Sequence, residues 1–195
     1  MTIFASSPHL LYNHHMIAKE IIRKCPKVEL HEHLDGGLRP ETIIELAEER
    51  NISLPSHDRD ELKAWFSKGS AEKSLSLYLE AFSVTVSVMQ DKESLKRVAM
   101  EELEDLAKDN VVYAEIRFAP ILHTEKGLSM EEVVEAVLEG LQEGRRKTGV
   151  EFGLILCAMR HQSPELSLEV AELAVAFSER GVVGFDLAGD ESGNP

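Results

Sequence analysis

The sequence has few cysteines and no long apolar run. Only Cys25 and Cys157 occur among 195 residues, far apart and without the paired spacing of a zinc ribbon. This excludes a disulfide-stapled scaffold and predicts two reduced thiols in a cytoplasmic protein. No stretch approaches the roughly 18 apolar residues of a membrane span. Residues 1–12 also lack the basic start and apolar stretch of a secretory signal.

Basic residues are scarce as well. The chain has 21 Lys and Arg against 35 Asp and Glu, which gives a formal net charge of -14. An acidic surface repels phosphate backbones and anionic lipid, so nucleic acids and membranes are not expected as partners. The hydrophobic share of 43% is ordinary for a folded domain, and the length suits one domain. We therefore expect residues 1–195 to belong to a single domain.

Four short apolar or alternating segments are typical of β-strands, and helical patterns lie between them. In residues 111–118, for example, Ala114, Ile116 and Phe118 alternate with Tyr113, Glu115 and Arg117. Helix starts are marked by Asp91, Ser129 and Ser163, each placed as an N-cap. The four predicted strands cover residues 28–33, 111–118, 152–158 and 182–188.

This alternation predicts right-handed βαβ units and a parallel sheet. The connection after the first strand is much longer than the others and holds helical patterns at residues 40–50, 58–66 and 74–89. A doubly wound sheet would normally carry a Gly-rich phosphate turn after its first strand, and Gly36-Gly37 does not form one. A (β/α)₈ barrel is favoured instead. Because a complete barrel needs about 250 residues, we expect only its first four βα units here.

The segment His31-Glu32-His33 closes the first predicted strand. Residues two apart in a strand point to the same face, so both imidazoles should project together from the strand end. Two neutral imidazoles suit a borderline-soft divalent metal such as zinc. Alone, this pattern is weak, and its weight depends on the motifs elsewhere in the chain.

Four segments together resemble the adenosine deaminase family. They are PKVELHEHLDGGLRP at residues 26–40, YAEIRFAP at 113–120, CAMRH at 157–161 and GFDLAGDE at 184–191, in the family's order. The resemblance implies a Zn²⁺-dependent (β/α)₈ hydrolase of purine salvage. It would convert adenosine to inosine, and deoxyadenosine to deoxyinosine, with release of ammonia. Its expected partner is a small-molecule purine nucleoside.

The family's functional residues can be carried over only where this sequence matches its motifs. His31 and His33 match two zinc ligands. His33, Asp35 and Gly189 match substrate contacts, with Asp35 at the ribose and the backbone N–H of Gly189 at the purine ring. The family's remaining metal ligands and its catalytic acid have no counterpart here. No catalytic residue is therefore assigned within the chain, and these groups are expected beyond Pro195.

Several of these residues also have a simpler interpretation. Asp35 suits the turn before Gly36-Gly37, and Asp186 could be a strand-end carboxylate that orients a loop. Glu115 and Arg117 are predicted to form a structural ion pair. His161 is predicted to be structural. His14 and His15 are predicted to lie in an N-terminal helix. His9, His57 and His123 are predicted to lie on the surface.

Three functional alternatives remain open at this point. The enzyme could deaminate adenine or a modified nucleotide instead of adenosine, although an aspartate at position 35 favours a nucleoside, because adenine-specific relatives tend to carry glutamate there. The chain could also be a non-catalytic half-barrel. Such a half-barrel would leave two unpaired sheet edges, through which we expect self-association.

Overall fold

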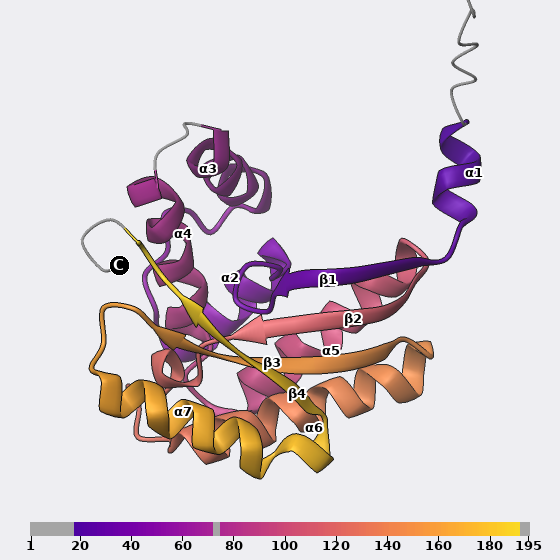
Figure 1. Ribbon diagram of the computed structural model, residues 1–195. Helices are drawn as coiled ribbons and strands as arrows, with labels where there is room; N and C mark the ends of the chain where they lie inside the picture. The colour runs from indigo at the N-terminus through magenta and orange to yellow at the C-terminus, as the bar shows by residue number, and fades with distance from the viewer. Residues whose placement is uncertain (1–17, 72–74, 192–195) are drawn as a thin grey trace, which may run out of the picture.

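The computed structural model describes residues 18–71 and 75–191. Within this part of the chain, four strands form one parallel sheet in the order β1-β2-β3-β4 (Figure 1). Their bounds are β1 Lys27–His33, β2 Val111–Phe118, β3 Glu151–Met159 and β4 Val182–Ala188. The predicted strands are confirmed, and the first and third are slightly longer than expected. His9, His14 and His15 lie outside the described residues.

The helices that connect successive strands cover one face of the sheet (Figure 1). They are α5 Lys92–Lys108, α6 Met130–Thr148 and α7 Pro164–Ala176, with the short turns η1 Pro120–His123 and η2 Ser178–Arg180. The side chains of Ala114, Ile116 and Phe118 point from β2 into the core beneath these helices. The alternation in the sequence therefore separates a helix-packed face from an inner face.

Local capping fixes where these helices begin. The Ser129 hydroxyl accepts from the Glu132 N–H at 3.1 Å, and the Glu132 carboxylate accepts from the Ser129 N–H at 3.0 Å, which completes a capping box. Asp91 accepts from the Ser94 N–H at 2.9 Å, and Ser163 accepts from the Leu166 N–H at 3.3 Å. All three predicted N-caps are confirmed.

The long connection between β1 and β2 places further helices beyond the carboxyl ends of the strands (Figure 1). These are α2 Pro40–Arg50, α3 Arg59–Ala71 and α4 Leu75–Val88, while α1 Lys19–Lys24 precedes β1 at the opposite end. The carboxyl ends of parallel strands are where barrel enzymes build their sites. No helix in the described ranges is long and apolar enough to cross a membrane.

The outer strands β1 and β4 expose large apolar side chains. Val28 and Leu30 on β1 are each 55% exposed, and Phe185 on β4 is 45% exposed. Strands of a closed barrel are covered on both faces, so these exposures are typical of an open sheet. The structure is thus four consecutive βα units of a (β/α)₈ barrel with a helical insertion after the first strand, as the sequence predicted.

Candidate functional site

The two histidines at the end of β1 lie side by side. The His31 and His33 ring centroids are 5.2 Å apart and the rings are tilted by 40°. The pairing of β1 with β2 shifts register between Glu29 and Glu32, so His31 lies within a bulge of the strand and His33 lies just after it. His31 is exposed and His33 is half-buried. The expected juxtaposition of the imidazoles is present.

The surroundings of His33 favour its neutral form. Burial lowers the pKa of His33, and electrostatic repulsion from the His31 side chain and from Arg117 lowers it further, while Asp186 opposes the shift. A neutral imidazole has a free ring nitrogen, which a metal ligand requires. The electrostatics therefore fit the chemistry of a ligand.

Asp35 is a buried acid with unused hydrogen-bonding capacity. Asp35 is 5% exposed, and its Oδ1 has no hydrogen-bond partner among the described residues. Burial raises the pKa of Asp35 to about 6. Buried polar atoms are normally paired, so an unpaired carboxylate oxygen beside a cavity is typical of a ligand contact.

A cavity of about 550 Å³ lies above the carboxyl ends of the strands. Each of the three residues expected to contact substrate, His33, Asp35 and Gly189, lines it. Gly189 follows β4 with φ +105°, a left-handed conformation that favours glycine. The remaining lining residues come from α4, from the segment after β2 and from the ends of β3 and β4: Phe82, Ser83, Val86, Ser87, Phe118, Ala119, Leu122, Glu125, Cys157, Met159, His161, Ala188, Asp190.

Two residues that line the main cavity, Phe82 and His161, were not predicted as part of the site. Phe82 on α4 meets His33 edge to face with ring centroids 6.0 Å apart, and it also lines a second cavity of about 330 Å³ that shares Asp35. His161, predicted to be structural, lines the main cavity. The only sequence signal for Phe82 was an apolar helical pattern inside an insertion after the first strand.

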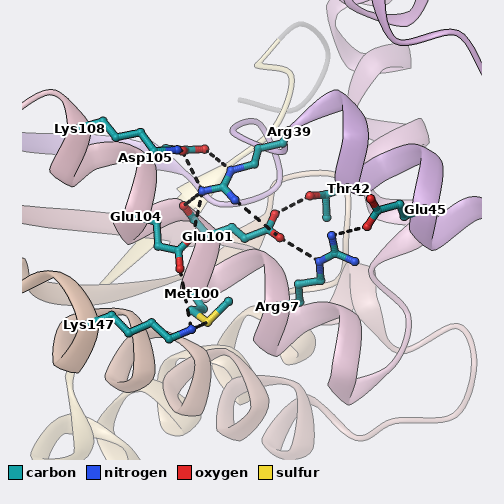
Figure 2. Close-up of polar contacts among 10 residues, drawn as sticks. All are labelled: Arg39, Thr42, Glu45, Arg97, Met100, Glu101, Glu104, Asp105, Lys108 and Lys147. Carbon is teal, nitrogen blue, oxygen red and sulfur yellow. Dashed lines mark hydrogen bonds and ion pairs between the residues drawn. The ribbon is translucent and has the colours of Figure 1, made fainter.

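The loop after His33 is anchored to α5 by Arg39 (Figure 2). The Arg39 guanidinium donates to both Asp105 oxygens at 2.7 and 2.8 Å and to Glu104 at 3.0 Å. Just beyond the loop, the Thr42 hydroxyl donates to Glu101 at 2.5 Å. A bidentate pair of this kind fixes both distance and orientation. The cluster therefore holds the loop that carries Asp35 against a rigid helix.

Two sequence predictions about charged side chains are wrong. Arg117 pairs with Asp186, with Nη1 and Oδ2 2.6 Å apart, and Glu115 instead accepts from the Tyr113 hydroxyl at 3.3 Å. His123 is not on the surface: it is fully buried, and its Nδ1 lies 2.9 Å from the Met89 carbonyl oxygen. Both partners are distant in sequence, so residue spacing could not indicate them. His57, in contrast, is exposed as predicted.

The described residues do not form a complete metal-binding group. No cluster of three or more His, Cys, Asp or Glu side chains suited to a metal occurs among them. The two adjacent imidazoles match zinc's preference for nitrogen donors, but a zinc site needs about four ligands. His31 and His33 therefore fit as part of a zinc site and not as the whole of it.

Comparison with known proteins agrees with this geometry. The sequence model of the adenosine deaminase family matches residues 26–195. Adenosine deaminase 1 of Streptomyces coelicolor is 55% identical over 180 residues, covering 89% of this chain and 45% of the relative. Among solved structures, adenine deaminase from Arthrobacter aurescens is similar with TM-score 0.75 and 32% identity, covering 87% of this chain and 50% of that one.

A zinc-bound amidohydrolase from Burkholderia ambifaria is similar with TM-score 0.79 and 26% identity, covering 91% of this chain and 48% of that one. The fold and site thus define a barrel of the amidohydrolase type. The chain belongs to the adenosine deaminase family. It spans about half the length of the curated relatives that it matches.

Proposed function

We propose that this chain is the N-terminal part of a zinc-dependent adenosine deaminase. The enzyme converts adenosine to inosine, and deoxyadenosine to deoxyinosine, with release of ammonia. The observation that carries the proposal is the cavity at the strand ends, where His33, the unpaired Oδ1 of Asp35 and Gly189 come together. The 55% identity to an adenosine deaminase supports the choice of substrate. A role in purine metabolism in the cytoplasm agrees with two free cysteines.

In this proposal each residue has a defined role. His31 and His33 supply two of the zinc ligands, and zinc, when bound, acts as a Lewis acid that makes water nucleophilic near neutral pH. Asp35 accepts a hydrogen bond from a ribose hydroxyl, and the Gly189 N–H meets the purine. Phe82 and Leu122 exclude water from the walls of the cavity. We assign the catalytic acid and the other metal ligands to a segment outside this chain.

The test is co-expression of the 195-residue chain with a segment that carries the other strands of the barrel. Ammonia release should be measured with adenosine, adenine and adenosine monophosphate as substrates. We expect adenosine to be turned over fastest by the complex, and no turnover by the chain alone. Turnover by the chain alone would contradict our placement of the catalytic acid. A complex that binds zinc stoichiometrically and has no deaminase activity would contradict the proposed function.

Adenine is the second candidate substrate. The Arthrobacter aurescens structure is described as an adenine deaminase and shares 32% identity with this chain. Asp35 at the cavity favours a nucleoside, because a short carboxylate leaves space for the ribose. Faster turnover of adenine than of adenosine in the same assay would select this alternative.

Zinc binding by the chain alone should be weak and should depend on the paired imidazoles. With two of about four ligands present, we expect substoichiometric zinc after dialysis. Replacing His31 or His33 by alanine should abolish the residual binding. His57→Ala is the matched control, because His57 is exposed and its Nδ1 lies 3.7 Å from Glu48 Oε1. Stoichiometric zinc that survives a mild chelator would show that further ligands lie within the chain.

We also propose that the chain alone self-associates through the open edges of its sheet. Unpaired edges with exposed apolar side chains such as Val28, Leu30 and Phe185 are templates for pairing with another chain. Size-exclusion chromatography with light scattering should therefore give a mass above that of one chain. Phe185→Lys should shift the distribution toward the monomer. A monodisperse wild-type monomer would contradict this proposal.

A further inference from the structure

Arg117 contacts the histidine-bearing strand at two points on either side of the histidine pair. Its own carbonyl accepts from the Leu34 N–H at 3.0 Å, and its Nη2 donates to the Leu30 carbonyl at 3.3 Å. Leu30 and Leu34 bracket His31 and His33. Arg117 is 9% exposed, so these contacts are made largely away from water.

The hydrogen bond from the Arg117 side chain stabilises an irregular part of β1. Leu30 lies where the pairing with β2 shifts register, between Glu29 and Glu32. A bulge leaves backbone groups outside the regular ladder, and these groups need other hydrogen-bond partners. Donation from Arg117 to the Leu30 carbonyl therefore stabilises the irregular stretch, which contains His31 and ends just before His33.

Asp186 on β4 fixes the other end of the guanidinium. Its Oδ2 lies 2.6 Å from Arg117 Nη1, and its Oδ1 accepts from the Leu187 N–H at 2.8 Å. The carboxylate is thus held by its own backbone while it holds Arg117. Arg117 consequently joins β1 to β4 across the inner face of the sheet, directly beside His33, the residue that it faces in the β1–β2 ladder.

We propose that Arg117, oriented by Asp186, is a positioning residue that sets the direction in which His31 and His33 leave β1. This inference rests on the proposed zinc-binding role of the two histidines. A purely electrostatic role makes the opposite prediction, because a nearby cation repels Zn²⁺ and its removal would strengthen metal binding. Lysine would preserve the charge, but it has a single nitrogen and cannot serve Leu30 and Asp186 in the forked geometry of arginine.

The first measurement is the affinity of the 195-residue chain for Zn²⁺, determined by competition with a chromogenic chelator. Arg117→Gln and Arg117→Lys should each weaken binding about tenfold or more, as expected when a group that orients metal ligands is lost. Asp186→Asn should weaken it less. Glu115→Gln is the control, because Glu115 lies on the same face of β2 as Arg117 and accepts a hydrogen bond from the Tyr113 hydroxyl instead of bonding to β1 or β4 within the described residues. Tighter binding by Arg117→Gln would overturn the proposal.

The second measurement does not depend on metal. Hydrogen exchange followed by mass spectrometry should show at least tenfold faster exchange of residues 28–34 in Arg117→Gln, with residues 154–158 of β3 unchanged. Unchanged exchange of residues 28–34 would overturn the positioning role. Faster exchange of both segments in Arg117→Gln and Asp186→Asn would overturn it too, since that result indicates general destabilisation. If the wild-type chain binds no zinc while residues 28–34 respond as expected, the zinc assignment fails and the positioning role stands.

Discussion

Replacing Asp35 by alanine should lower kcat/KM for adenosine at least about tenfold in the complex of this chain with its complementary segment. The reason is the loss of a desolvated acceptor: Asp35 lines the cavity, and its Oδ1 has no hydrogen-bond partner in the part of the chain that the structure describes. A site built to bond a substrate hydroxyl loses far more than a hydrophobic contact would when that bond is removed. Steady-state kinetics with adenosine measures the effect.

The same substitution should not destabilise the fold. A buried carboxylate oxygen without a partner costs roughly 1–3 kcal/mol in desolvation, so removal of the Asp35 carboxylate should leave the free energy of unfolding unchanged or higher. Asp35→Asn keeps one acceptor oxygen and should retain more activity than Asp35→Ala. The exposed Asp109, replaced by alanine, serves as a kinetic control. Wild-type kcat/KM in Asp35→Ala, combined with a clear loss of stability, would return Asp35 to a purely structural turn role.

Replacing Glu102 by glutamine should stabilise the protein strongly at alkaline pH. Glu102 is buried on α5, against the Gly37 backbone in the loop that Arg39 anchors. Burial, together with the negative charges of Glu32 and Asp105, raises the pKa of Glu102 to about 8, while Arg39 opposes the shift. A carboxyl group with a folded-state pKa above its unfolded value keeps its proton in the fold and must lose it as the pH rises.

The pH window follows from these two pKa values. Below about pH 4.5 the group is protonated in both states and has no effect on stability. Stability is lost as the pH rises from there toward 8, and the full cost, on the order of 5 kcal/mol as an upper limit, is present above pH 8. Glutamine mimics the neutral acid. The variant and wild type should therefore unfold at similar temperatures at pH 4.5, and the variant should be more stable by several kcal/mol at pH 8.5.

Thermal unfolding at one fixed protein concentration between pH 4.5 and 8.5 measures this difference. Glu104→Gln is the matched control on the same helix. Glu104 is partly exposed and bonded to Arg39 at 3.0 Å, so its loss should cost at most about 1 kcal/mol. Parallel pH profiles for wild type and Glu102→Gln would show that Glu102 is ionised in the fold at neutral pH.

Much of the fold was readable from local sequence patterns. The alternation in residues 111–118 and the caps at Asp91, Ser129 and Ser163 act over a few residues, and the structure confirms each of them. The pairing of His31 with His33 is equally local, since a strand returns to the same face every second residue. Fold class, strand order and the metal-ligand candidates were therefore accessible without a structure.

The surroundings of the site were decided only by tertiary structure. Arg117 pairs with Asp186, 69 residues away, and not with Glu115, two residues away. The reason is that the parallel sheet brings the inner faces of β2 and β4 together. His123 is buried because the segment after β2 packs against the end of α4 and the residue that follows it, Met89, whose carbonyl lies 2.9 Å from His123 Nδ1. Phe82 reaches His33 only because the insertion folds over the strand ends. Sequence indicated the candidate site residues, whereas long-range packing determined their partners, since contact between distant segments leaves no periodic pattern in the chain.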